Sequence, residues 1–204
     1  MNTGVVSDAC TGAGCCGSGF GLANVMTTPF NDPYVGAIPA SPFGGTKVAK
    51  LNDAATGARA VRIRKNINVT PNNALFQFAY IAVLNVPGNT HPCCAVPKIK
   101  IRIIDPSGNV LGCPQVEISV PQGGCPPLPA GWVSSGAVVY NPTWQIGSID
   151  LTSSLGQNIS IIVDVYDCTW TGHFGYAYFD AICKPITIDV NGIQFPAGNN
   201  NTRV

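Results

Sequence analysis

The chain has 204 residues, of which 46% are hydrophobic and only 10% are charged, and its formal net charge is +1. This balance lacks the basic surface that nucleic-acid binding needs, and no apolar run approaches the roughly 20 residues of a membrane-spanning helix. We therefore expect neither a nucleic-acid partner nor membrane insertion. The 23 glycines and 17 prolines interrupt segments rich in Val, Ile, Thr and aromatic residues, which favours strands over long helices.

The first 45 residues are expected to add little to a core. Residues 1–20 form a lead segment rich in cysteine and glycine, which we expect to be held against the main domain by disulfide bonds. Residues 21–45 contain four prolines and the interleaved aromatics Phe30, Tyr34 and Phe43. This second segment is expected to be loop-like and to cover one edge of the domain.

The regular part of the chain follows a pattern of short strands. Residues 58–64 read as a half-buried strand, and residues 74–84 are apolar on both faces, as in a central strand. Residues 98–104 alternate strictly, which places three isoleucines inward and Lys98, Lys100 and Arg102 in water. Further strands are expected at residues 116–120, 159–166 and 175–183.

Eight to ten strands without a helix indicate an all-β chain. We predict a two-sheet antiparallel β-sandwich of the jelly-roll type over residues 21–184, stapled by disulfides. Residues 185–204 are expected to be a C-terminal edge strand or the start of a following domain. The alternation in residues 186–190 supports either interpretation.

The nine cysteines predict an oxidising, extracellular or cell-surface location. Cys113 with Cys125 would close a short loop, and Cys168 and Cys183 are expected to bridge each other or to staple neighbouring loops. A zinc site that combines the N-terminal cysteines with His91 is disfavoured by their spacing. The N-terminus lacks the basic and apolar regions of a signal peptide, so we expect a piece of a longer exported chain that begins at an added Met1. All nine cysteines are disulfide candidates: Cys10, Cys15, Cys16, Cys93, Cys94, Cys113, Cys125, Cys168 and Cys183.

Residues 167–183 combine a turn with an aromatic strand and carry the candidate functional residues. A Cys168–His173 nucleophile is disfavoured because no oxyanion motif accompanies it, so we expect no catalysis. Trp170, His173 and Tyr176 are candidate ligand contacts, because exposed aromatic rings can stack on sugars. Asp180 lies inside the aromatic strand, where it would bind a calcium ion or serve as a hydrogen-bonded structural carboxylate.

Two groups of segments carry a resemblance to a known family. The first group comprises residues 72–80 and 101–109, and the second comprises residues 149–152, 156–159 and 167–178. Together they resemble a jelly-roll module of very large cell-surface and secreted proteins of gliding bacteria that use type IX secretion, the gliding adhesins among them. The resemblance covers roughly residues 45–184. It implies an exported, non-enzymatic module, and related galactose-binding-like jelly rolls hold a structural calcium through an aspartate that Asp180 matches.

These observations lead to one main functional hypothesis and two alternatives. The main hypothesis is a structural and adhesive module of a bacterial surface protein, with neighbouring domains, surface glycans or other surface proteins as its partners. The first alternative is a carbohydrate-binding module. The second is a subunit of an extracellular filament, in which the strand at residues 186–190 adds to a neighbour's sheet.

Overall fold

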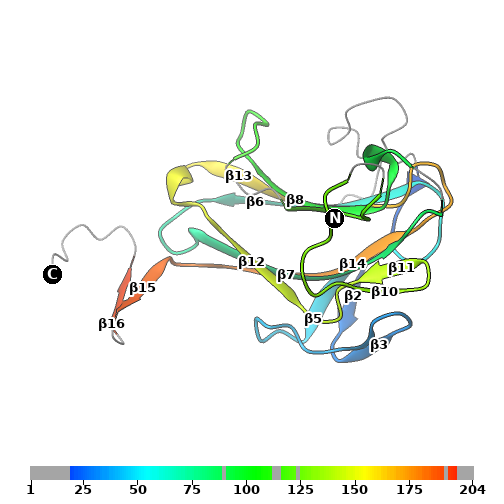
Figure 1. Ribbon diagram of the computed structural model, residues 1–204. Coiled ribbons are helices and arrows are strands. Elements are labelled where there is room, and N and C mark those ends of the chain that lie inside the picture. Colours follow the sequence, from blue (N-terminus) through cyan, green and yellow to red (C-terminus); the bar gives the residue numbers. More distant parts are fainter. Residues whose placement is uncertain (1–18, 89–90, 112–115, 123–124, 191–192, 197–204) are drawn as a thin grey trace.

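The computed structural model describes residues 19–88, 91–111, 116–122, 125–190 and 193–196 (Figure 1). Cys10, Cys15, Cys16 and Cys113 lie outside the described residues, as does most of the lead segment. Two sheets pack face to face, and the predicted all-β sandwich is confirmed. Between residues 19 and 196, the described helical structure consists of two short 3-10 turns, η1 (Cys93–Ala95) and η2 (Thr152–Ser154). No described helix has the length and apolar character that crossing a membrane requires.

The first sheet has five strands, and all its pairs are antiparallel except that of the edge strand β1 with its neighbour β6. In spatial order they are β1 (Gly19–Phe20), β6 (Arg59–Asn68), β13 (Asn158–Tyr166), β8 (Lys98–Ile104) and β9 (Val116–Ser119).

The second sheet has seven strands and is antiparallel throughout. In order they are β10 (Val133–Ser135), β11 (Val138–Tyr140), β7 (Leu75–Asn85), β14 (Gly175–Lys184), β5 (Lys47–Leu51) and β2 (Ala23–Thr27), with β12 (Gln145–Asp150) also paired to β7.

The connectivity is that of a jelly roll. One sheet contains β5, β14, β7 and β12 side by side, and the other contains β6, β13, β8 and β9. The chain therefore crosses repeatedly from one sheet to the other, which brings loops from distant parts of the sequence to the same end of the sandwich.

The core between the sheets follows the alternation of the sequence. Ile99, Ile101 and Ile103 of β8 are buried, as their period of two predicts. The expectation that Lys98 and Arg102 face water was wrong, since they are only 7% and 9% exposed. Lys98 donates to the carbonyl of Cys93 and pairs with Glu117, while Arg102 pairs with the buried Asp164. The outer face of β8 is thus covered by ion pairs and by the η1 loop.

A second, smaller core lies on the outer face of the seven-stranded sheet. The hairpin of β3 (Phe30–Asp32) and β4 (Gly36–Ile38) packs there against side chains of β5, β7 and β14, below the sheet in Figure 1. Residues 28–45 therefore cover a face of the sandwich rather than one edge, which corrects the expectation. This cover explains why β7 is apolar on both sides.

Asp32 fastens the cover to the sheet. Its Oδ2 accepts hydrogen bonds from the hydroxyls of Tyr176 and Tyr178, each at 2.7 Å, and its Oδ1 accepts from the backbone N–H of Tyr34 and Val35. Tyr176 is fully buried. The prediction that Tyr176 contacts a ligand was therefore wrong, because the cover occupies the surface that it faces.

The buried tyrosines predict alkaline unfolding. Burial raises the pKa of Tyr80 to about 12 and also raises the pKa of Tyr166, Tyr176 and Tyr178. In the unfolded chain a phenol ionises near pH 10, so the stability present below pH 10 should fall above it, by about 1.4 kcal/mol per pH unit for each group. Tyrosinate absorbance should therefore rise together with loss of the circular dichroism of the fold. Ionisation of these phenols near pH 10 in a folded chain would contradict the burial.

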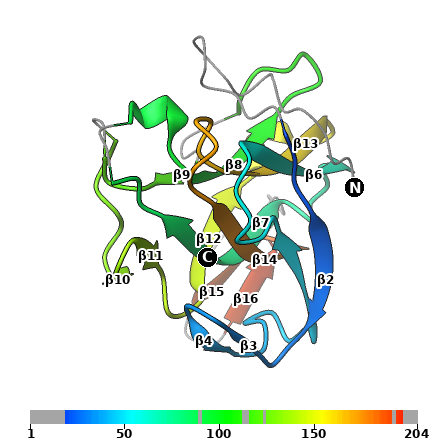
Figure 2. The ribbon, with the colours of Figure 1, turned by 90° about the vertical axis from the view of Figure 1, so that its right-hand side faces the viewer.

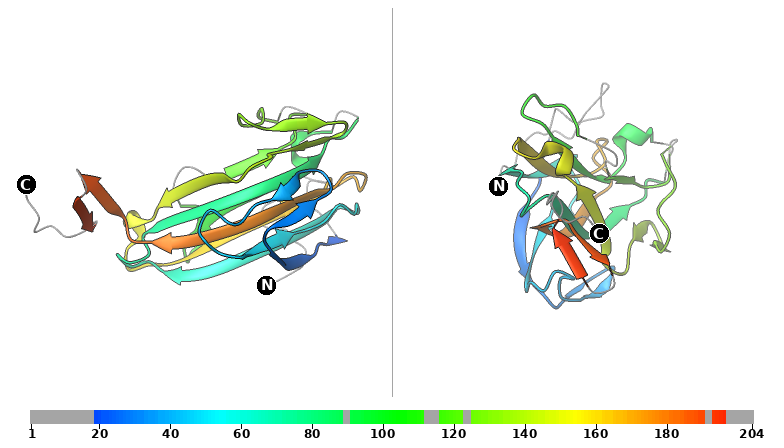
Figure 3. Two further views of the ribbon diagram at one scale, coloured as in Figure 1. Left: turned by 90° about the horizontal axis from the view of Figure 1, so that it is seen from below. Right: turned by 90° about the vertical axis from the view of Figure 1, so that its left-hand side faces the viewer.

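The C-terminal hairpin stands apart from the sandwich. β15 (Thr187–Val190) pairs with β16 (Ile193–Pro196), and Figures 1 and 3 show this hairpin projecting beyond the end at which β14 finishes. The strand expected at residues 186–190 is present, and one of its edges is paired within its own hairpin.

Candidate functional site at the loop end of the sandwich

The opposite end of the sandwich is formed by two loops that meet. Residues 167–174 connect β13 to β14, and residues 91–97 lead through η1 into β8. β8 and β13 are antiparallel neighbours in which Lys98 pairs with Tyr166, so the start of one strand lies beside the end of the other. The N–H of Thr169 donates to the carbonyl of Ala95 at 3.0 Å. Figure 2 looks onto this end, where both loops lie in front of the sheets.

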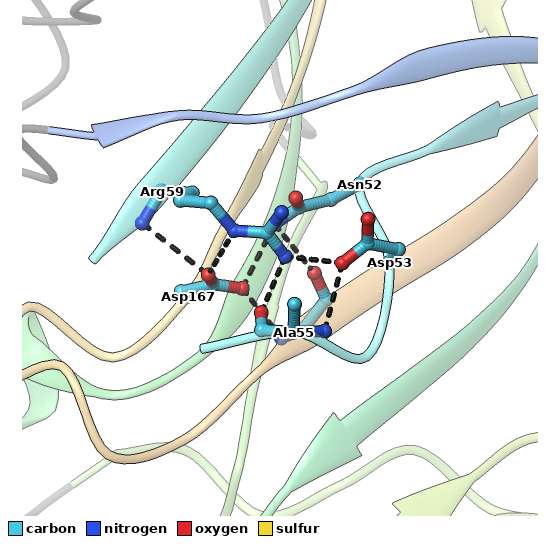
Figure 4. A network of polar contacts seen from close by, with 6 residues as sticks. Asn52, Asp53, Ala55, Arg59 and Asp167 are labelled. Atoms are coloured by element: carbon cyan, nitrogen blue, oxygen red, sulfur yellow. Dashed lines mark hydrogen bonds and ion pairs between the residues drawn. The ribbon is translucent and has the colours of Figure 1, made fainter. Parts of the chain in front are cut away.

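A buried carboxylate anchors the base of the longer loop (Figure 4). Asp167 is fully buried, and its Oδ1 accepts from the side chain of Asn52 at 2.8 Å and from the N–H of Gly175 at 2.9 Å. Its Oδ2 accepts from the backbone N–H and the Nε of Arg59, whose guanidinium also pairs with Asp53. Burial raises the pKa of Asp167 to about 6, while the bonds from Gly175 and Arg59 act in the opposite direction.

The loop itself is tightly turned. The N–H of Cys168 donates to the carbonyl of His173 at 2.9 Å, and that of Thr171 donates to the carbonyl of Cys168 at 3.1 Å. Thr171 has a φ of 67°, in the left-handed region that a β-branched residue rarely adopts. A residue held in this way indicates a loop whose shape is fixed by its surroundings.

The two loops bring three metal-ligating side chains together. His91 and His173, the two histidines of the chain, lie with Cys168 so that one ligating atom from each is within 4.8 Å of the others. The Sγ of Cys168 is 3.3 Å from the Nδ1 of His91. Cys168 is fully buried and His91 is 5% exposed, so the cluster sits beneath the surface of the loop end.

Trp170 lies above this cluster. Its ring meets that of His91 edge to face, with 4.4 Å between the centroids, yet 55% of the residue is exposed. The other two tryptophans, Trp132 and Trp144, are half-buried. Of the three tryptophans, Trp170 therefore presents the largest share of its surface to solvent.

The cluster does not have the electrostatics of an activated nucleophile. Burial raises the pKa of the Cys168 thiol, although N–H groups of the loop partly oppose this effect. Burial and the neighbouring His91 lower the pKa of His173. A nucleophilic cysteine needs a lowered pKa and a cationic partner, and both shifts go the other way.

The cysteine pairing differs from the prediction. Cys93 bonds Cys125, with Cα atoms 4.9 Å apart, so the expected Cys113–Cys125 loop was wrong; Cys94 is also disulfide-bonded. Cys168 and Cys183 are free thiols, so they form neither the bridge nor the staples expected of them. The ten-residue strand β14 separates them by about 30 Å along the sandwich. Disulfides are typical of proteins that fold in oxidising compartments, which agrees with an extracellular location.

The predicted site residues are thus divided between two places. Trp170 and His173 lie at the loop end, whereas Asp180 accepts hydrogen bonds from the hydroxyl of Ser41 and the N–H of Ala181. Among the described residues, one group of three or more His, Cys, Asp or Glu side chains lies close enough together to hold a metal ion. This group is the cluster at the loop end, and Asp180 does not belong to it. Calcium at Asp180 stays a prediction.

The contribution of His91 to this cluster was missed. Its separation of 77 residues from Cys168 hides the contact in the sequence. The signal that could have revealed it is the strand order, because antiparallel pairing of β8 with β13 places the residues before β8 beside those after β13.

Hollows of the described residues away from the loop end include one of about 310 Å³, lined by Arg64, Asn66 and Ser160 among others, and two further ones. Of these two, one of about 480 Å³ is apolar and lies beside β10 and β11, where it is lined by Val86, Leu128, Trp132 and Val139 among others. The other, of about 350 Å³, opens between the sheets near Phe76, Ile161, Phe179 and Cys183. None of these three hollows combines an exposed aromatic ring with metal-ligating side chains, as the loop end does.

The fold and the loop end define a jelly-roll β-sandwich with a His–Cys–Trp cluster at one end. No family model and no curated protein matches the chain. Among solved structures, the enzymatically active domain of tailspike protein 4 of bacteriophage CBA120 has a TM-score of 0.37 at 16% identity, over 81% of this chain and 19% of that one.

Two structures of carbohydrate-binding modules are also among those to which the chain is similar. The module CBM27-1 of Caldicellulosiruptor saccharolyticus, solved with mannohexaose, has a TM-score of 0.37 at 7% identity, over 79% of this chain and 83% of that one. A structure described for promiscuous carbohydrate-binding modules of the β-sandwich superfamily has a TM-score of 0.34 at 11% identity, over 78% and 54%. The chain thus spans about a fifth of the tailspike chain and about half of the last structure.

Proposed function

We propose that the chain is a non-catalytic, extracellular β-sandwich module that binds carbohydrate at its loop end, with Trp170 as the stacking platform. The observation that carries this proposal is the 55% exposure of an indole whose ring packs against that of His91. An aromatic face is electron-rich and attracts the C–H bonds of a sugar ring. Thr171 and His173, in the same loop, offer hydroxyl and imidazole groups for sugar hydroxyls.

The loop is suited to binding because it is ordered in advance. Asp167 holds its base through Asn52, Arg59 and Gly175, and the bond from Thr169 to Ala95 ties it to the η1 loop. A preordered loop loses little conformational entropy when a ligand binds.

The faces of the sandwich offer less to a glycan. Residues 28–45 cover the part of the seven-stranded sheet formed by β5, β7 and β14. The outer face of the five-stranded sheet carries the ion pairs of Arg62 and Arg102 with Asp164. Neither face presents an exposed tryptophan, because Trp170 lies in a loop and Trp132 and Trp144 are half-buried.

The carboxylates near the loop end favour binding over hydrolysis. A glycosidase needs two carboxyl groups across its bond-cleaving site. Both oxygens of Asp167 are engaged in hydrogen bonds beneath the loop, and the metal-ligating cluster contains no carboxylate. The raised pKa of Cys168 likewise disfavours a thiol nucleophile.

The adhesive role is a further part of the proposal. A glycan-binding module in a large surface protein would attach the cell to a coated surface, as the gliding-adhesin resemblance implies. Secretion by the type IX route, neighbouring domains and a structural calcium at Asp180 rest on that resemblance of the sequence alone.

We expect Trp170→Ala to weaken glycan binding by about 30-fold or more, the effect of losing a central aromatic anchor worth about 2 kcal/mol. A glycan array would first select an oligosaccharide, and calorimetry would then compare the variants. Ile146→Ala on β12 is a matched control, because it also removes a highly exposed apolar side chain (60%). Unchanged affinity in Trp170→Ala, or no binding to any glycan by the wild-type chain, would refute the proposal.

A further inference from the structure

The three side chains beneath Trp170 have a composition that is unusual for a buried core cluster. Both histidines of the chain are in it, together with a free thiol, although Cys93, Cys94 and Cys125 are oxidised to disulfides. A free cysteine often serves as a small apolar core residue. Two imidazoles from separate loops directed at one thiol are not explained by that role.

The geometry fits one transition-metal ion. In a tetrahedral zinc site, bonds of about 2.3 Å to sulfur and 2.0 to 2.1 Å to nitrogen place the ligating atoms roughly 3.4 to 3.6 Å apart. The Sγ of Cys168 and the Nδ1 of His91 are already 3.3 Å apart. All three ligating atoms lie within 4.8 Å of one another. The distances from the atom of His173 to the other two therefore need to shorten by little more than about 1 Å to reach those of a zinc site.

An unsatisfied nitrogen supports the same conclusion. The Nδ1 of His173 is buried and has no hydrogen-bond partner among the described residues. Leaving a buried polar atom unpaired is destabilising, so such atoms usually have a role or a ligand. A metal ion between the two loops would use the ligating capacity of the cluster.

We propose that His91, Cys168 and His173 bind one zinc ion, whose fourth coordination position is left to water or to a ligand at the loop end. Thiolate with imidazole ligands favours zinc over calcium or magnesium, which take oxygen ligands. On binding, the thiol of Cys168 releases its proton to solvent and the thiolate sulfur bonds the metal. The ion would join the loop before β8 to the loop after β13 and fix the ring of His91 under Trp170.

Cobalt(II) provides a direct test, because a cobalt–thiolate bond produces a charge-transfer band in the near ultraviolet. The full chain, stripped with a chelator and kept free of oxygen, should bind one cobalt ion and release it when zinc is added. Cys168→Ala should abolish the band, whereas Cys183→Ala, which removes the other described free thiol, should retain it. His173→Ala should weaken binding by about 100-fold or more, since it removes one of three protein ligands.

A second readout keeps the test valid if Cys168→Ala fails to fold. His173 is only half-buried in a surface loop, so His173→Ala should fold as the wild-type chain does. Zinc should protect Cys168 from alkylation in the wild-type chain and not in His173→Ala, as mapped by peptide mass spectrometry. Absence of stoichiometric cobalt binding, a band that survives in Cys168→Ala, or equal protection in both chains would overturn the proposal.

Discussion

Replacing Asp164 by alanine should lower the free energy of unfolding by about 3 to 5 kcal/mol. Asp164 is fully buried on β13, and its carboxylate accepts from the Nε of Arg62 at 2.6 Å and from a terminal nitrogen of Arg102 at 2.7 Å. Its removal leaves two guanidinium groups without their buried counter-charge. Urea unfolding of both chains, compared at equal slope, measures the loss.

Two further variants test whether the loss of stability comes from buried charges left without a partner or only from the loss of a contact. Glu117→Ala removes a carboxylate that pairs with Lys98 and Lys100 but is 40% exposed, and it should cost less than about 1 kcal/mol. Replacing Arg62, Arg102 and Asp164 together by leucine should recover much of the stability, because no charge is then left unpaired. An Asp164→Ala chain as stable as Glu117→Ala would show that the buried ion pairs do not hold the sheet.

The second large effect should follow Asp32→Ala, at about 3 kcal/mol of lost stability. This change leaves the buried hydroxyls of Tyr176 and Tyr178 without a hydrogen-bond partner, and each unpaired hydroxyl costs about 1 to 3 kcal/mol. It also frees the N–H groups of Tyr34 and Val35 at the turn of the β3–β4 hairpin. Limited proteolysis should therefore begin within residues 28–45 while the sandwich stays folded.

A mutant cycle separates the two consequences of that change. With Tyr176 and Tyr178 both replaced by phenylalanine, Asp32→Ala should cost clearly less than in the wild-type background, because no phenol is stranded. Equal costs in both backgrounds, or a cleavage pattern unchanged by Asp32→Ala, would contradict the role of Asp32 as the fastening of the cover.

The arrangement of strands was largely predictable because burial has a period of two in a sheet. The three isoleucines of β8 indicate a buried face, and the apolar residues on both sides of β7 indicate a central strand. Alternation identifies which side chains share a face, but it does not say what covers that face. Lys98 and Arg102 were expected in water because Asp164 and Glu117, their partners, come from other strands.

The candidate site was predictable in part, for a similar reason. Trp170 and His173 belong to one short loop, so local sequence identifies them together. His91 joins them through strand pairing across 77 residues, and the spacing of the cysteines gave no indication that Cys168 stays free. Tyr176 was predicted wrongly for a different reason. From the sequence alone, an aromatic residue on a strand can be either an exposed ligand contact or a core residue. The β3–β4 hairpin covers Tyr176 and makes it a core residue.

The most direct test of a carbohydrate site at the loop end is a nuclear magnetic resonance titration of the isotope-labelled wild-type chain. With the oligosaccharide selected on the array, amide shifts should concentrate in residues 91–95 and 168–174, together with the indole N–H of Trp170. Shifts centred on the apolar hollow around Val86, Trp132 and Val139, or spread along the faces of the sheets, would contradict this assignment of the site.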